Sequence, residues 1–107
     1  MNERAQLLAG QTYEKIAGKP VSEFTRWDWD KVARELRLTF ERQGENPDAA
    51  GESARRIAQH IAAGQTPDQA VISAVPDLPP EDRGRLAKLG WHQYLLELAE
   101  RRRDQRA

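Results

Sequence analysis

The sequence predicts an all-α fold, a single compact bundle of about five helices with the C-terminal helix at its centre. In several segments, apolar residues recur every three to four positions, which is the period of an amphipathic helix. Proline, glycine and small polar residues separate these segments. No segment alternates β-branched and polar residues as a strand would. Because the chain has 107 residues, we expect residues 1–107 to form one domain.

The first two helices are predicted over residues 2–17 and about 25–43. Gly18 and Pro20 end the first, and Gly44 ends the second. Thr25 and Asp28 have the spacing of a capping box at the start of the second helix, or Asp28 itself caps a helix that begins at Trp29. The inner face of the first is expected to contain Ala5, Leu8, Ala9, Thr12, Tyr13 and Ile16. That of the second is expected to contain Trp29, Val32, Ala33, Leu36 and Phe40.

The third and fourth helices are predicted to open in the same way, with a capping residue followed by proline. Asn46 and Pro47 open the third, which ends at Gly64. Thr66 opens the fourth, which Pro76 ends. Their expected inner residues are Ala50, Ala54, Ile57, Ala58 and Ile61 in the third helix, and Ala70, Val71, Ala74 and Val75 in the fourth.

The fifth helix is predicted from the paired prolines at 79 and 80 to about Arg103. Its apolar residues cover a wide arc, which is typical of a helix surrounded by others. They are Leu86, Ala87, Leu89, Trp91, Tyr94, Leu95, Leu96 and Leu98. Gly90 is expected to weaken or bend the helix. The basic segment from about residue 101 is expected to fray.

The second helix carries a second, sparser stripe opposite its main one. At 3.6 residues per turn, this stripe contains Trp27, Lys31, Arg34 and Leu38. One apolar stripe is sufficient to dock a helix onto a core, so the second predicts a contact with another molecule or another part of the chain. Trp27 could instead pack on residues 21–24 or lie over Lys31 or Arg34. As a partner site, the two cations between the two apolar residues favour an acidic protein surface.

Composition and motifs argue against an enzyme or a metal protein. His60 and His92 fall on different helices, and neither has a carboxylate one helical turn away. The serines lack a nucleophile motif, and the chain has no cysteine. We therefore expect no catalytic residues, no metal site and no cofactor. We also expect a cytoplasmic protein without membrane contact, since no signal peptide and no long apolar run is present.

Nucleic-acid binding is the main alternative to protein binding. The candidate residues are Arg55, Arg56, Arg83, Arg85, Lys88, Arg101, Arg102 and Arg103. Against it, 17 basic and 17 acidic residues give a formal net charge of zero, so no global field attracts phosphates. The short fourth helix also lacks the long polar side chains of a recognition helix. A homodimer through the second stripe is a third alternative.

The sequence thus favours a small intracellular protein-binding module. Such a module would be a regulator, inhibitor or adaptor of a larger protein, and would act through a helical face. The alternative is a nucleic-acid-binding accessory factor that uses the arginine clusters of the second half of the chain.

Overall fold

The structure, a computed structural model, describes residues 2–105. Those residues form five α-helices and two short 3-10 helices and contain no β-strand. In chain order the elements are α1 (Glu3–Ala17), η1 (Val21–Glu23), α2 (Arg26–Arg42), η2 (Pro47–Ala49), α3 (Gly51–Ala62), α4 (Pro67–Ala74) and α5 (Pro80–Gln105). The predicted all-α class is confirmed.

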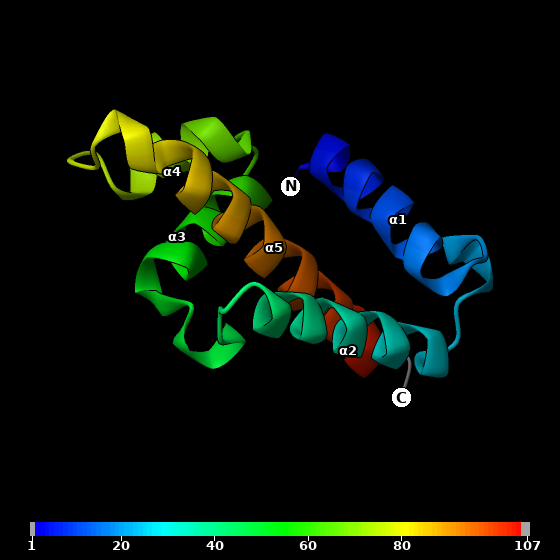
Figure 1. Cartoon of the computed structure of the whole chain (residues 1–107). Helices are drawn as coiled ribbons and strands as arrows, with labels where there is room; N and C mark the ends of the chain where they lie inside the picture. The colour runs from blue at the N-terminus through cyan, green and yellow to red at the C-terminus, as the bar shows by residue number, and fades with distance from the viewer. Residues whose placement is uncertain (1, 106–107) are drawn as a thin grey trace.

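Helix α5 is the central element, as its wide apolar arc predicts. It packs against α2, α3 and α4. In Figure 1, α3 and α4 lie beside the first half of α5, and α2 lies along the second half. Its buried residues face all three neighbours: Ala87, Leu89, Gly90, Gln93, Tyr94, Leu95, Leu96, Leu98 and Ala99. Helices α2, α3 and α4 can therefore each bury an apolar stripe against this one.

Gly90 is where α3 and α5 approach each other most tightly. A Cβ atom at this position would lie 2.2 Å from Cγ2 and 2.7 Å from Cβ of Ile57. Both residues are fully buried. The glycine thus lets the Ile57 side chain rest directly on the backbone of α5, a role that a sequence reading limited to helix propensity does not anticipate.

Helix α1 is attached at two points. Near its start, the Asn2 side-chain oxygen accepts a hydrogen bond from the Ala5 N–H, and the Asn2 amide donates to the carbonyl oxygens of Ile61 and Gln65, 3.0 Å away in each case. Further along, the buried Tyr13 hydroxyl donates to the Leu95 carbonyl oxygen of α5 at 2.6 Å. These contacts tie both ends of α1 to the rest of the bundle.

The start of the third helix differs from the prediction. The Asn46 side chain does accept from the Asp48 N–H at 2.9 Å, but it caps the separate 3-10 turn η2. Gly51 then takes a φ of +89°, a conformation that glycine adopts without strain. The backbone therefore changes direction at Gly51, and α3 begins there.

Some residues expected in the core are less buried than predicted. Leu8 is 44% exposed, and Ala50, Val75 and Trp91 are half-buried. For Leu8 the reason is the position of α1, which buries Ala5, Ala9 and Tyr13 while Leu8 lies at the margin of that contact.

The basic segment at the C-terminal end also differs from expectation. Helix α5 continues to Gln105, so Arg101, Arg102 and Arg103 lie within its last turns. The Arg102 guanidinium lies 5.8 Å from the centre of the Trp29 ring, and Arg103 forms an ion pair of 3.6 Å with Asp30. These contacts hold the end of α5 against α2.

We expect Gly90→Ala to lower the free energy of unfolding by about 1–3 kcal/mol, because the new methyl group overlaps Ile57 in a packed contact. Gly84 is the matched control. It lies in the same helix, and a Cβ atom there meets nothing within 4 Å. Gly84→Ala should therefore stabilise by about 0.5–1 kcal/mol through helix propensity. Urea denaturation of the two variants measures both effects, and stabilisation by Gly90→Ala would contradict the close packing.

Candidate protein-docking face of α2

The N-terminal turn of α2 is fixed by a capping box. The Asp28 carboxylate accepts from the Thr25 N–H at 2.8 Å and from the Thr25 hydroxyl at 3.0 Å. Lys19 lies 3.2 Å from the same carboxylate. The Thr25 N–H is the main reason that the pKa of Asp28 lies below its ordinary value. The backbone that carries Trp27 therefore has a defined conformation.

The two tryptophans of this turn point in opposite directions. Trp29 is 2% exposed, and its ring packs edge-on against Tyr13 at 5.3 Å and Phe24 at 4.8 Å between ring centres. Trp27 is 76% exposed. Residues 21–24 therefore do not cover Trp27, and the cation–π contact within residues 2–105 involves Trp29 instead. The predicted outward position of Trp27 agrees with the structure.

The other three residues of the predicted stripe are exposed as well. Leu38 is 40% exposed, and Lys31 and Arg34 lie in solvent between it and Trp27. Arg34 forms an ion pair of 3.1 Å with Asp30, one turn earlier on α2. No ion pair is found for Lys31 within the described residues. The face thus has an apolar residue at each end and cations in the middle.

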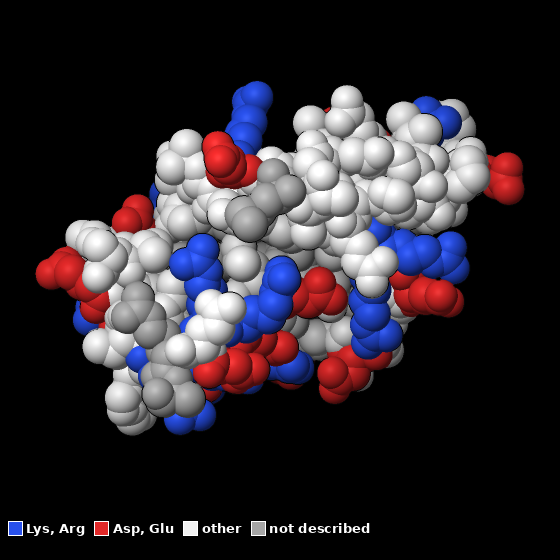
Figure 2. Space-filling view, turned by 180° about the vertical axis from the view of Figure 1, so that it is seen from behind, with Lys and Arg blue, Asp and Glu red and all other residues white. Residues whose placement is uncertain are grey.

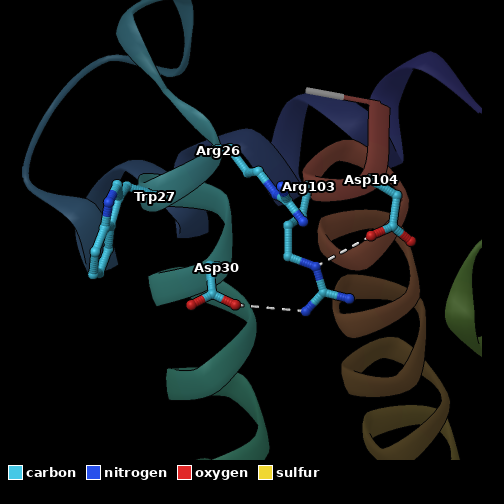
Figure 3. Close-up of a pocket in the computed structure, with 5 residues that line it drawn as sticks. All are labelled: Arg26, Trp27, Asp30, Arg103 and Asp104. Carbon is cyan, nitrogen blue, oxygen red and sulfur yellow. Dashed lines mark hydrogen bonds and ion pairs between the residues drawn. The ribbon is translucent and has the colours of Figure 1, made fainter. Parts of the chain in front are cut away.

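An open hollow of about 470 Å³ lies beside this face, between the start of α2 and the end of α5. It is lined by Arg26, Trp27, Asp30, Arg103 and Asp104. Figure 3 shows Asp30 and Arg103 facing each other across the gap, with Trp27 pointing outward from the other side of α2. Arg103 is 3.3 Å from Asp104 as well as paired with Asp30. Sequence reasoning missed this hollow because it depends on how α2 and α5 meet.

The predicted nucleic-acid residues are not brought together. Arg55 donates to the Asp48 carbonyl oxygen at 3.0 Å, and Arg56 pairs with Glu52 at 3.5 Å. The cluster of Arg83, Arg85 and Lys88 is near the start of α5, and that of Arg101, Arg102 and Arg103 is near its end. From residue 85 to residue 101 the helix rises about 24 Å. Figure 2 shows basic and acidic side chains interleaved over one face of the molecule, so no continuous basic stripe forms on that face.

The polar groups that could do chemistry have structural roles. The described residues contain no group of three His, Cys, Asp or Glu side chains placed to hold a metal ion. The His92 ring packs edge-on against Phe40, with 5.7 Å between ring centres. Burial lowers the pKa of His92, and the positive charge of nearby Lys88 lowers it further. Burial raises the pKa of Tyr13, whose hydroxyl is bonded to Leu95. His92 thus contacts α2, and the Tyr13 hydroxyl joins α1 to α5.

A second apolar surface lies along α1, and sequence reasoning missed it. Leu8 and Trp91 together line two adjoining hollows, of about 490 and 300 Å³. The signal available was the spacing of Arg4, Leu8 and Lys15, which share a helix face. That signal was obscured because Leu8 also fits the core stripe of α1.

No protein-family model, curated protein or solved structure matches this chain. Between residues 2 and 105, none of the helices has the length and apolar character that crossing a bilayer requires. The candidate face is therefore interpreted from its own geometry and charge.

We expect Leu38→Ala to have little effect on stability, while Leu36→Ala lowers the free energy of unfolding by about 2–5 kcal/mol, as buried large-to-small changes do. Leu36 is 5% exposed and Leu38 is 40% exposed, and both lie on α2. Thermal or urea denaturation of the two variants provides the comparison. Equal losses would show that Leu38 belongs to the core and is not available for docking.

Nucleic-acid binding is expected to be weak, because the cation clusters are separated and partly paired with acids. A labelled 20-base-pair duplex and a single strand of the same length, titrated at about 50 and 200 mM salt, measure the effect. Any binding at low salt should fall steeply with salt, as phosphate contacts do. Tight sequence-selective binding at the higher salt would contradict this prediction and favour an accessory factor of nucleic acids.

Proposed function

We propose that the chain is a small protein-binding module that docks a partner through the outer face of α2, and so acts as a regulator, inhibitor or adaptor of a larger protein. The single observation that supports this most is Trp27, which is 76% exposed on an ordered helical turn. A tryptophan buries about 150–250 Å² when covered. At ~25 cal/mol per Å², covering it favours the complex by several kcal/mol, from which the entropic cost of association is subtracted.

Trp27 already has a defined position in the unbound protein. Two residues later, Trp29 is held by Tyr13, Phe24 and the Arg102 guanidinium. The capping box described above fixes the same turn. Binding then orders one side chain, without the larger entropic cost of ordering a loop. Tryptophan and arginine are also the residue types most often found at energetic hot spots of interfaces.

The charge between the apolar ends indicates the partner's chemistry. Lys31 and Arg34 lie between Trp27 and Leu38, which are about 16 Å apart along the helix axis. A complementary surface carries acidic groups between two apolar pockets. A stable interface buries about 800 Å² on each side, more than this stripe offers. Contacts around the hollow with Arg26 and Arg103 are therefore included in the proposed interface.

Pairing of this face with a second copy is less favourable. In an antiparallel two-fold contact, Trp27 of one chain lies opposite Leu38 of the other, and Lys31 lies opposite Arg34. The centre of such a dimer contains four cations, whose repulsion opposes the apolar contacts. An acidic partner meets the same cations with attraction. The absence of cysteine, typical of proteins in reducing compartments, supports a partner inside the cell.

We expect Trp27→Ala to reduce partner capture by more than about fivefold, which corresponds to roughly 1 kcal/mol, with little change in thermal stability. The measurement is affinity capture from a nuclease-treated lysate of the source organism, with quantitative mass spectrometry of the retained proteins. Ile72→Ala is the matched control, because Ile72 is 51% exposed on α4 and lies outside the proposed face.

Two outcomes would contradict the proposed function. If Trp27→Ala unfolds the protein and partner loss follows unfolding, Trp27 is structural. If Trp27→Ala and Ile72→Ala reduce capture equally, the outer face of α2 has no special role. Retention of the partner only when nuclease is omitted would instead favour nucleic acid as the bridging ligand.

A further inference from the structure

A second surface, here called the α1 groove, runs along α1 beside α5. Two adjoining hollows form it, of about 490 and 300 Å³. Leu8 and Trp91 line both hollows, so they mark its middle. The residues contributed by α1 are Arg4, Ala5, Leu8, Gln11, Thr12 and Lys15. The turn from Gly64 to Pro67 closes one end. Apart from the two cations, this lining is uncharged.

The groove exists because α1 is held near its ends and left uncovered between them. Asn2 ties the start of α1 to the end of α3, and Tyr13 ties its second half to α5. Between these contacts, Leu8 stays 44% exposed and Trp91 half-buried. The Trp91 ring stacks on Tyr94, with 5.4 Å between ring centres and 24° between planes. This contact holds the Trp91 ring in place at the side of the groove.

The charges on the groove are all of one sign. Arg4, Leu8, Gln11 and Lys15 follow one face of α1 at spacings of three and four residues. Arg4 and Lys15 are exposed, and no ion pair joins either to a carboxylate of residues 2–105. Nearby Glu14 is engaged elsewhere, since its carboxylate accepts from the Val21 N–H at 2.8 Å. The two cations are about 16 Å apart along the helix, on either side of Leu8.

We propose that the α1 groove binds an acidic amphipathic helix of a partner protein. Apolar side chains of that helix contact Leu8 and Trp91, and carboxylates about three helical turns apart meet Arg4 and Lys15. This is the helix-in-groove mode, in which apolar anchors one turn apart carry affinity and charges set orientation. A second copy of this chain fits less well, because antiparallel pairing of α1 with itself places Arg4 opposite Lys15. None of these residues belongs to the α2 face, so the inference does not rest on the proposed function.

The test is a selection from a displayed library of 20-residue amphipathic helices, randomised at apolar and charged positions, with the full chain as bait. Enriched peptides should carry excess Asp or Glu on both sides of an apolar cluster. Leu8→Gln should weaken their binding at least tenfold. Leu7→Gln is the matched control, since Leu7 is 65% exposed on the same helix and does not line the groove; it should leave binding unchanged. Trp27→Ala should also leave it unchanged.

Charge reversal gives the sharper readout. With Arg4→Glu/Lys15→Glu as bait, the selection should enrich basic peptides. With Arg4→Gln/Lys15→Gln as bait, the selected peptides should show no charge preference. Because all four substitutions are at exposed positions, melting temperatures should stay close to that of the wild type.

Several results would overturn the proposal. The first two are a lack of enrichment over an unrelated helical bait and a lack of acidic excess in the enriched peptides. The third is an equal loss of peptide binding in Leu7→Gln and Leu8→Gln. Loss of peptide binding in Trp27→Ala would assign the peptides to the α2 face. Concentration-dependent dimerisation in sedimentation, abolished by Leu8→Gln, would assign the groove to a second copy of the chain.

Discussion

The burial of α5 on nearly every side is the constraint on which the other helices depend. Leu89, Tyr94 and Leu95 are all at most 9% exposed although they point in different directions around the helix. No single neighbour covers that circumference, so α2, α3 and α4 must surround α5. Gly90 sets how near α3 comes, because Ile57 occupies the space of its missing side chain. The arrangement follows from one helix that has no exposed residue from 89 to 100.

The candidate docking face is a consequence of how α2 joins that core. Residues two positions apart on a helix are about 200° apart around its axis, so an inward Trp29 requires an outward Trp27. Trp29 packs on Tyr13 and Phe24 and lies under Arg102, so it touches three other segments of the chain. The interior contact is therefore what holds the exposed ring in place. The same turn of α2 thus serves stability through Trp29 and the proposed binding through Trp27.

A chain of zero net charge presents cations at both proposed surfaces, while several of its acids are bound to other groups. Asp28 caps α2, the Glu14 carboxylate binds the Val21 N–H, and Glu100 pairs with Arg37 at 2.7 Å. Lys31 and Lys15 are left in solvent next to exposed apolar residues. Each surface therefore carries exposed cations, although the formal charges of the whole chain cancel. In both proposals this local charge is what would attract an acidic protein surface.

The sequence by itself determined the helices, the capping box at the start of α2 and the outward position of Trp27, because each depends on residues within one or two turns of one another. Tertiary structure alone decided what covers each face. Leu8 fits the core stripe of α1 yet remains exposed, because α1 touches the bundle along one edge only. Gly51 separates a 3-10 turn from α3 through a backbone conformation that no side-chain pattern encodes. The groove beside Trp91 and the contact of Arg102 with Trp29 join residues far apart in the chain. Helical periodicity carries no information about such pairs, since it records which side of a helix is apolar and not which neighbour lies against it.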